Sequence, residues 1–255
     1  MDQKWEDKAY NLTQCEAFVK RASKLGAELV IFPEMTMTGF TMNTKLSAEN
    51  ADDSESIKRC SEIADASNVA LIVGVVLKYD AQPRNTLAAF ASDGTEQARY
   101  SKIHPFSFSG ENQHFQSGSH LARMQLGKLS LGFSICYDLR FPELFSALAQ
   151  QSDVLINIAN WPKARLDHWL TLIKARAIEN QVYMIGVNRT GADGNGLEYE
   201  SSSVIYNPDG GLLIPEHLEG ELAMYEVSNA QIKSFREGFS TRHDRRTDLY
   251  KKFLN

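Results

Sequence analysis

The sequence predicts an α/β fold organised as a single domain over residues 1–255. Apolar runs typical of buried strands alternate along the chain with amphipathic segments of helical period. A length of 255 residues with 43% hydrophobic residues is enough to bury a substantial core. We find neither an internal repeat nor a linker-like stretch that would divide the chain, so one large domain is the simplest prediction.

The first part of the chain should contain two helices and three strands. Asn11 is the candidate cap of a first helix that runs to Leu25 and is ended by Gly26. The elements expected next are a strand at 28–32 that Pro33 stops, a helix at 54–67, and strands at 70–78 and 85–91. The last two strands should form a hairpin pair, and Asp93-Gly94 marks a turn after them.

The middle of the chain predicts a loop followed by a βαβ rhythm. Residues 100–118 carry aromatic residues, histidines and glycines without a clear period, so they should form a long loop, and long ordered loops are often functional. The elements expected after it are a strand at 129–136, a helix opening at Phe141-Pro142-Glu143, a strand at 153–159, a helix at about 167–180 and a strand at 182–188.

The end of the chain predicts antiparallel strands and a polar tail. Strands are expected at 203–207, 211–214 and 221–227, with an Asn-Pro-Asp-Gly turn at 207–210. Residues 229–255 should form a short helix and a charged tail. This segment is too polar to make a core of its own, so we expect it to pack on a neighbour or to extend to a partner.

The charge balance argues against several classes of partner. A count of 27 basic and 32 acidic residues gives a net charge of -5, which offers no basic surface for a nucleic acid. No stretch approaches the ~20 consecutive apolar residues of a membrane helix. Residues 1–10 are too charged for a secretory signal, so we expect a cytoplasmic protein with no nucleic-acid or membrane partner.

The cysteines and histidines do not suggest a metal or a disulfide. Cys15, Cys60 and Cys136 are widely spaced and form no CxxC pair, so we expect neither a disulfide framework nor a zinc site. Cys15 and Cys60 lie in helical segments and are interpreted as small core residues. Four of the six histidines, at His104, His114, His120 and His168, are scattered rather than spaced as ligands. No metal and no cofactor are expected.

Cys136 and Glu34 both follow predicted strands. Side chains just beyond the carboxyl ends of strands in open α/β sheets converge on the crevice where ligands bind. The helix that opens near Pro142 should direct unpaired N–H groups and a positive dipole toward Cys136, which would favour a thiolate and later an oxyanion. Glu34, if within hydrogen-bond reach, could take the thiol proton and return it to a departing amine. Lys102 could stabilise the negative charge on the attacked carbonyl.

Each of these residues also has an ordinary structural interpretation. A lone cysteine at a strand end is usually a core residue, a glutamate after a strand is usually a cap or solvated, and a loop lysine is usually exposed. A serine hydrolase is a further alternative, because Gly132-Phe133-Ser134 begins like GxSxG. Cys136 replaces the final glycine that this sharp turn needs, so we interpret Ser134 as a strand residue.

Three motifs favour the catalytic interpretation of these residues over the structural one. In chain order they are FPEMTMTGF, YSKIHPF and GFSICYDLRFPEL. Together with NIANWP, HWLTLIKARAIENQVYMIGVNRTGADGNG and the turn at 207–210, they resemble the nitrilase superfamily over nearly the whole chain. Within it the sequence most resembles the omega-amidase group, whose members hydrolyse the terminal amide of 2-oxo acid amides such as 2-oxoglutaramate and release ammonia. The resemblance implies a four-layer α-β-β-α sandwich that forms a homodimer through helices and the carboxyl-terminal tail.

The same resemblance implies roles for individual residues. Glu34 matches the general base, Lys102 the cation that stabilises the oxyanion, and Cys136 the nucleophile that forms a thioester intermediate resolved by water. Glu111 matches a second glutamate that orients the lysine and the incoming water. The backbone N–H of Tyr137 matches the second oxyanion donor.

The resemblance also places a substrate pocket at these motifs. The residues implied for its wall are Tyr137, Phe40, Trp161 and Arg140. The Arg140 guanidinium could bind a substrate carboxylate through two parallel hydrogen bonds. It could equally form a salt bridge with Asp138 or Glu143 that holds the turn, and we favour this structural role slightly because ion pairs between neighbouring residues commonly brace such turns.

One strand of the superfamily pattern is missing from this sequence. Members normally begin with an apolar strand that ends in glutamine, followed by the stretch that residues 2–11 resemble. The sheet should therefore lack this first strand, which leaves unpaired backbone groups, and we expect the natural product to begin upstream of Met1.

The predicted function is hydrolysis of a small omega-amide of a 2-oxo dicarboxylic acid. Alternatives on the same fold are an N-carbamoyl-compound hydrolase and a nitrilase. An alternative from another class is a non-catalytic binding or scaffold protein, and the complete set of Glu34, Lys102 and Cys136 argues against it.

Overall fold

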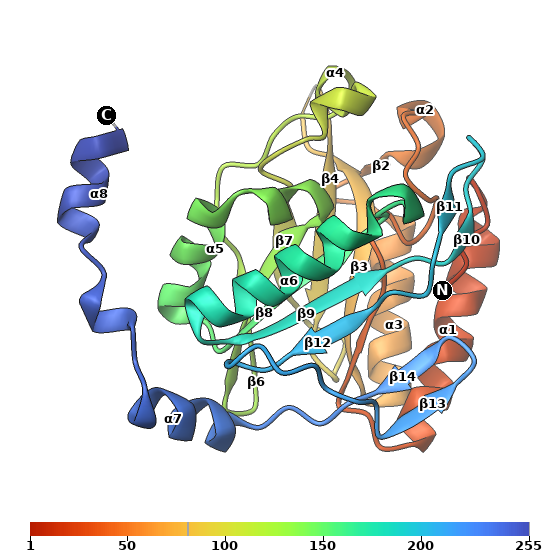
Figure 1. The fold of residues 1–255 in the computed structure, drawn as a ribbon. Coiled ribbons are helices and arrows are strands. Elements are labelled where there is room, and N and C mark those ends of the chain that lie inside the picture. Colours follow the sequence, from red (N-terminus) through yellow and green to blue (C-terminus); the bar gives the residue numbers. More distant parts are fainter. Residues whose placement is uncertain (81, 255) are drawn as a thin grey trace.

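Two β-sheets face each other at the centre of the protein, and helices cover the outer face of each sheet (Figure 1). The computed structural model describes residues 1–80 and 82–254. The order of the layers is helix, sheet, sheet, helix, so the predicted α-β-β-α sandwich is confirmed.

The first sheet is built around a long hairpin. Its strands are β1 (Leu29–Ile31), β2 (Glu49–Asn50), β3 (Ala70–Lys78), β4 (Pro83–Phe90) and β5 (Glu96–Ser101). Their order is β1-β3-β4-β5, with β2 paired to β3. The antiparallel pairing of β3 with β4 confirms the predicted hairpin. Strand β5 is absent from the sequence prediction, which placed Tyr100 in the loop, because this terminal strand is mostly polar and only half buried.

The second sheet carries the predicted βαβ rhythm. Its order is β12 (Val204–Tyr206), β9 (Tyr183–Asn188), β8 (Val154–Ala159), β7 (Leu129–Ile135) and β6 (Arg123–Leu126). The three central strands are parallel, as crossover connections through helices require. Strand β6 has no counterpart in the sequence prediction, and the strand expected at 211–214 is only a bridge between Tyr206 and Leu212.

Two short hairpins complete the described strands. They pair β10 (Gly191–Ala192) with β11 (Glu198–Tyr199), and β13 (His217–Glu219) with β14 (Leu222–Met224). The strand expected at 221–227 is therefore shorter and pairs locally rather than joining a large sheet.

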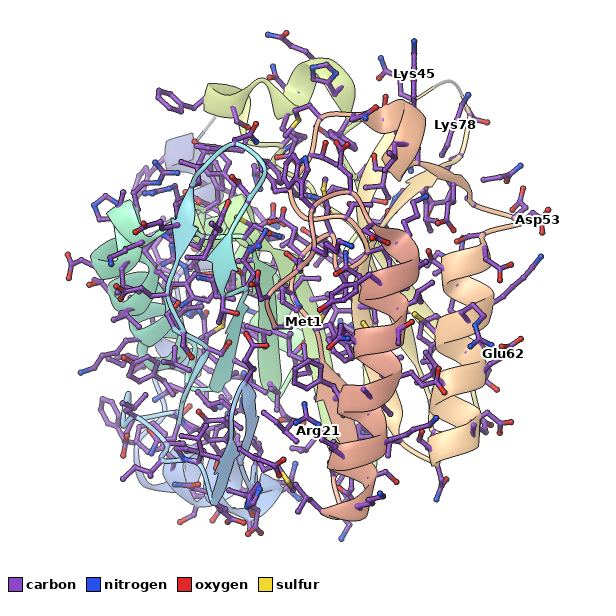
Figure 2. The ribbon with its side chains drawn as sticks, turned by 90° about the vertical axis from the view of Figure 1, so that its right-hand side faces the viewer. Met1, Arg21, Lys45, Asp53, Glu62 and Lys78 are labelled. Atoms are coloured by element: carbon purple, nitrogen blue, oxygen red, sulfur yellow. The ribbon has the colours of Figure 1, made fainter. Side chains whose placement is uncertain are left out.

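The outer helices follow the sequence prediction closely, with one wrong cap. They are α1 (Lys8–Lys24) and α3 (Glu55–Ser67) on the first sheet, and α5 (Pro142–Leu148) and α6 (Leu166–Asn180) on the second. Figure 2 shows α1 and α3 side by side. Helix α1 is capped by Asp7, whose side chain accepts from Tyr10 N at 3.0 Å. Asn11 is instead buried, and its amide donates to the carbonyls of Lys4 (2.7 Å) and Met37 (2.8 Å).

Strand alternation sorts the apolar side chains of β3 into two interfaces. Leu71 and Val73 pack with α1 and α3, whereas Ile72 packs against the other sheet, with Phe133 and Ile156. A third apolar layer lies between the second sheet and α5 and α6. Three cores therefore hold the four layers together, and the strand ends of both sheets meet at one side of the central core.

The two termini are placed differently, since Met1 is buried in the core between the first sheet and its helices, whereas the carboxyl-terminal segment leaves the sandwich. Before α1 the described residues form one bridge, Asp2 with Thr190, and no strand. At the other end, α7 (Asn229–Gly238) buries Ile232, and a 3₁₀ turn, η5 (Arg242–Asp244), precedes α8 (Thr247–Leu254). Helix α8 extends away from the sandwich (Figure 1).

Candidate active site

A buried cluster of three charged side chains lies beyond the strand ends of the first sheet. Lys102, just after β5, donates from Nζ to Glu34 Oε1 at 2.8 Å and to Glu111 Oε2 at 2.8 Å. Glu34 follows β1, and Glu111 opens α4 (Glu111–His114), a single turn of helix within the predicted loop. All three side chains are at most 1% exposed. The structure thus brings together three of the four residues for which a catalytic role was expected from the sequence, and it buries Lys102, which spacing alone could not place.

Two asparagines that the sequence did not identify complete this cluster. Asn85, on β4, donates from Nδ2 to Glu34 Oε1 at 2.7 Å and to Glu111 Oε1 at 2.9 Å. Asn160, after β8, donates its backbone N–H to Glu34 Oε2 at 2.9 Å. The signal that could have found Asn160 is its place directly after a parallel strand, as for Glu34 and Cys136. Asn85 lies within a strand and gives no such signal.

The electrostatics of the cluster keep Lys102 charged. Burial by itself lowers the pKa of Lys102, but Glu111 and Glu34 outweigh burial and hold this pKa above its ordinary value. An ammonium in this position can serve as a fixed positive charge toward a neighbouring carbonyl oxygen.

Cys136, the fourth expected residue, lies at the end of β7 next to this cluster. Its Sγ is 4.0 Å from the carbonyl oxygen of Asn160. Its backbone φ of 45° lies in the left-handed region, which residues with a side chain adopt only when the surroundings enforce it. Both Glu34 and Lys102 are close enough to act on the pKa of the thiol.

A carboxylate behind Cys136 enforces this conformation. Asp138 is fully buried in η2 (Cys136–Arg140), and its Oδ2 accepts from Ile135 N at 3.0 Å and from the Tyr100 hydroxyl at 2.7 Å. Its Oδ1 accepts from His104 N at 3.0 Å and lies 2.8 Å from His104 Nδ1. The carboxylate therefore ties the turn that carries Cys136 to β5 and to the loop that follows it.

The helix expected to open near Pro142 is confirmed, but the thiolate that it was expected to favour is not. Cys136 begins the 3₁₀ turn η2, whereas α5 starts only at Pro142. Burial raises the pKa of Cys136 well above its ordinary value, Glu34 raises it further, and Lys102 only partly opposes these effects. The resting side chain is therefore a thiol, and a base beside it has to remove the proton when the thiol attacks.

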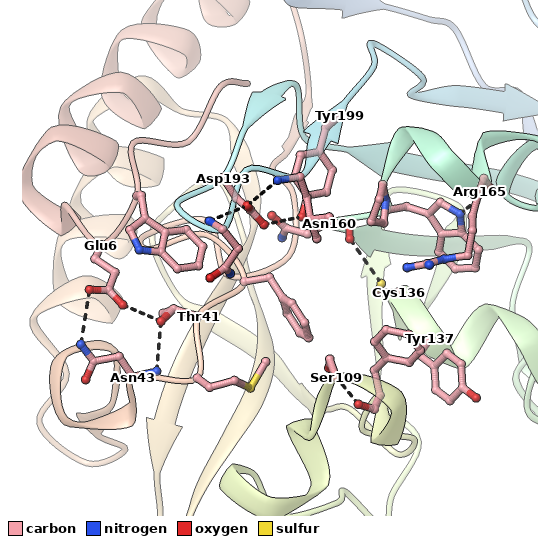
Figure 3. A pocket seen from close by; sticks show the side chains of 18 of the residues that line it. Glu6, Thr41, Asn43, Ser109, Cys136, Tyr137, Asn160, Arg165, Asp193 and Tyr199 are labelled. Atoms are coloured by element: carbon pink, nitrogen blue, oxygen red, sulfur yellow. Dashed lines mark hydrogen bonds between the residues drawn. The ribbon is translucent and has the colours of Figure 1, made fainter.

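A pocket opens above Cys136. Its volume is about 540 Å³, and it is lined by Phe40, Cys136, Tyr137, Arg140, Asn160, Trp161, Arg165 and Tyr199 among others. Figure 3 shows Cys136 and Tyr137 on the same side of this pocket. All four residues that the sequence placed on the pocket wall do line it. The Phe40 ring also contacts the buried charged cluster, since Lys102 Nζ is 5.2 Å from its centroid.

The favoured structural role of Arg140 is wrong. In the described part of the chain Arg140 forms no ion pair with Asp138 or Glu143, because Asp138 is already bound by Ile135, Tyr100 and His104. The Arg140 guanidinium instead stacks over the Trp161 ring at 4.9 Å and faces the pocket.

No helix within residues 1–80 and 82–254 combines the length and the apolar character needed to cross a membrane. In the same residues no three His, Cys, Asp or Glu side chains are grouped so that they could hold a metal ion.

Comparisons with known proteins agree with this geometry. The family model described as carbon-nitrogen hydrolase matches residues 1–237. An omega-amidase YafV from Yersinia enterocolitica is 35% identical, over 94% of this chain and 92% of that protein. A 2-oxoglutaramate amidase from Bacillus subtilis is 29% identical, over 94% and 93%. The solved structure of XC1258 from Xanthomonas campestris, a CN-hydrolase superfamily protein with an arsenic adduct in its active site, superposes with a TM-score of 0.88 at 29% identity, covering 96% of this chain and 94% of that one.

Proposed function

The chain belongs to the carbon-nitrogen hydrolase family, and we propose that it hydrolyses a small omega-amide of a 2-oxo dicarboxylic acid, of the 2-oxoglutaramate type, with release of ammonia. The family establishes a hydrolase that acts on carbon-nitrogen bonds other than peptide bonds. The observation that carries the proposal is the buried Glu34, Lys102 and Glu111 cluster beside the Cys136 thiol at the base of a pocket. The names of two relatives support the substrate class.

The acylation step uses the groups that surround Cys136. Glu34 takes the thiol proton as Sγ attacks the amide carbon, which offsets the raised pKa of Cys136. The oxyanion that forms is stabilised by Lys102 Nζ and by the Tyr137 N–H, which belongs to the first turn of η2 and has no helical acceptor. Collapse of this intermediate breaks the carbon-nitrogen bond. Glu34 returns the proton to the leaving nitrogen, so that ammonia and a Cys136 thioester are the products.

In the deacylation step, water takes the place of the thiol as the attacking group, and Glu34 again accepts and then returns a proton. Glu34 removes a proton from a water molecule that attacks the thioester carbonyl, and the carbon-sulfur bond then breaks. The acyl group leaves as a carboxylic acid, which ionises, and the proton held by Glu34 returns to the thiol. Glu111 keeps Lys102 in place throughout, because it accepts two of the hydrogen bonds of the ammonium group.

Ammonia release tests the proposed reaction. The wild-type protein should release ammonia from 2-oxoglutaramate, and Cys136→Ala should lose the activity by a factor of at least about 10⁴, as expected for removal of a nucleophile. Cys15→Ala, which changes a buried cysteine outside the pocket, is the matched control and should keep it. Turnover of nitriles or N-carbamoyl compounds without turnover of 2-oxoglutaramate would instead assign one of the alternative activities on this fold.

Alkylation of the thiols tests the non-catalytic alternative. Cys136 is partly exposed, whereas burial raises the pKa of Cys60 to about 12 and that of Cys15 well above its ordinary value. Peptide mass spectrometry should therefore find iodoacetamide on Cys136 first. Because the pKa of Cys136 is also raised, labelling of the free enzyme should accelerate as pH rises from about 7 to about 9. Equal labelling of the three cysteines would favour a scaffold protein.

We also propose that the protein is a cytoplasmic homodimer that binds neither nucleic acid nor membrane. Three free thiols among the described residues suit a reducing compartment. The aromatic side chains of Phe239, Tyr250 and Phe253, in the carboxyl-terminal segment, are exposed and suit association with a second copy.

A further inference from the structure

The charged groups of the pocket are divided between two sides. Figure 3 shows Glu6 and Asp193 on one side and Arg165 on the other. Glu6 is already bonded within the protein, since its carboxylate accepts from Thr41 Oγ1 at 2.5 Å and from Asn43 Nδ2 at 3.3 Å. Both acidic groups make the first side unfavourable for an anionic ligand.

Asp193 is bonded within the protein in the same way. Its Oδ2 accepts from the Tyr199 hydroxyl at 2.9 Å, and its Oδ1 accepts from the backbone N–H groups of Asn195 at 2.9 Å and Leu197 at 3.0 Å. The lone pairs of this carboxylate are thus largely used, so it offers a cationic ligand little that is free.

The arginines on the opposite side have no acidic partner. Within residues 1–80 and 82–254, neither Arg140 nor Arg165 forms an ion pair, and both line the pocket. Each guanidinium is instead stacked on an aromatic ring of the pocket wall. Arg140 lies 4.9 Å from the centroid of Trp161, and Arg165 lies 5.6 Å from that of Phe106. Stacking on a ring holds the plane of a guanidinium and leaves its edge N–H groups able to donate. One edge nitrogen of Arg140, Nη2, lies 3.3 Å from His168 Nδ1.

The backbone beneath Arg165 is also fixed. Arg165 ends the 3₁₀ turn η4 (Lys163–Arg165), and its carbonyl accepts from Trp161 Nε1 at 2.7 Å. Trp161 therefore touches both arginines, one through its ring face and one through its indole N–H. Both arginines, each partly buried, therefore contact one aromatic residue that lines the pocket together with Cys136.

We propose that Arg165 and Arg140 together form the subsite for the carboxylate of the substrate, with Arg165 as a specificity-determining residue. The inference rests on the proposed function, because it concerns the end of the amide substrate that does not react. An omega-amide of a dicarboxylic acid carries one carboxylate, which two guanidinium groups without an acidic partner can bind with parallel N–H···O bonds. The amide at the other end then reaches Cys136, and Glu6 and Asp193 discourage the reversed or displaced orientation.

A matched pair of substrates tests this subsite. Succinamate and succinamide have the same length and the same reacting amide, but only succinamate carries a carboxylate. The wild type should prefer succinamate, and Arg165→Met should lower its kcat/KM for succinamate by about 10- to 100-fold, mainly through KM, as expected for a lost hydrogen bond to a charged group. The kcat/KM for succinamide should change by less than about threefold. Arg165→Lys keeps the positive charge but not the pair of parallel N–H donors of the guanidinium, so it should recover part of the loss.

Lys163→Met is the control variant. It removes a positive charge from the same turn, but Lys163 pairs with Glu200 outside the pocket at 2.8 Å, so neither substrate should be affected. Equal losses with succinamate and succinamide in Arg165→Met would overturn the subsite and assign Arg165 to holding the turn.

Binding to Cys136→Ala separates the subsite from the reaction. Calorimetry on this variant should show succinamate binding at least about tenfold tighter than succinamide, and the difference should vanish when Arg165→Met is added. That result supports the subsite even if the wild type proves to hydrolyse no amide, which would remove only the proposed function. Equal binding of the two compounds overturns the subsite.

Discussion

At the scale of single residues, the cluster below the pocket contains more negative than positive charge. Two carboxylates share one ammonium, and all three side chains are shielded from water. Such an arrangement is stable only if further donors reach the carboxylate oxygens. Asn85 provides these donors, because its two amide hydrogens reach Glu34 and Glu111. We therefore regard Asn85 as a positioning residue for the proposed base.

Changing Asn85 to aspartate should alter the pH profile of the enzyme. Asn85→Asp replaces two donors with a third carboxylate, and added negative charge disfavours ionisation of the neighbouring carboxyl groups. The acidic limb of kcat/KM should move to higher pH, by about one unit, and kcat at neutral pH should fall about 100-fold.

The control for this change is Asn157→Asp, in a second buried strand asparagine whose amide donates to Ser134 Oγ at 3.0 Å. It should lower stability without moving the acidic limb. An unmoved limb in Asn85→Asp, or the same shift in both variants, would contradict the role given to Asn85.

At the scale of elements, the turn η2 matters more than the helix that follows it. The nucleophile is held in a left-handed conformation that costs about 1–3 kcal/mol, and Asp138 stabilises this turn by accepting hydrogen bonds from three residues. The position of Cys136 is thus set by a buried carboxylate.

Removing this carboxylate should release the turn. Asp138→Ala leaves the donors of Ile135, Tyr100 and His104 without an acceptor. The free energy of unfolding should therefore fall by about 3–5 kcal/mol, and kcat should fall as well. Tyr100→Phe removes one of these hydrogen bonds and should lower the free energy of unfolding by about 1 kcal/mol.

Denaturant unfolding and steady-state kinetics measure both effects. Asp138→Asn, which keeps one acceptor oxygen, should lie between the other two variants. Equal stability of Asp138→Ala and Tyr100→Phe would show that the carboxylate does not organise the turn.

The sequence predicted an element well where neighbouring residues determine it, and poorly where contacts with distant segments do. The helix predicted at 54–67 is α3, which Ser54 caps, and the continuous apolar run of β3 gives both bounds of that strand. Strands β5 and β6 were missed because their partly exposed sequences contain too few apolar residues to stand out. Asn11 resembles a cap, yet a buried contact with the segment after Glu34 outweighs that preference.

At the scale of the whole molecule, the carboxyl-terminal segment presents apolar surface to solvent. Helix α8 extends from the sandwich (Figure 1), and the side chains of Tyr250 and Phe253 are 48% and 77% exposed. Phe239, before η5, is 64% exposed. A second copy of the chain would cover these aromatic groups, in agreement with the proposed homodimer.

Light scattering tests this assembly directly. The wild type should have the mass of two chains, and the double variant Tyr250→Ser and Phe253→Ser should shift the protein toward the monomer, because each exposed aromatic contributes about 1.5–3 kcal/mol when it is buried. Ile214→Ser is the control, since Ile214 is 84% exposed outside this segment. A wild-type monomer would contradict the homodimer.

The sequence by itself determined the fold class, the central parallel strands, the long hairpin and the candidates Cys136, Glu34, Lys102 and Glu111. These predictions follow from apolar periodicity, from positions at strand ends and from the family motifs. Each of these signals lies within a short stretch of sequence. Only the tertiary structure decided that Asn85 holds two glutamates together, that Asp138 holds the turn of Cys136, and that Arg140 lines the pocket with Arg165 instead of bracing the turn. These properties depend on burial and on contacts between distant segments, because both the cost of a buried charge and the direction of a side chain are set by what packs around it.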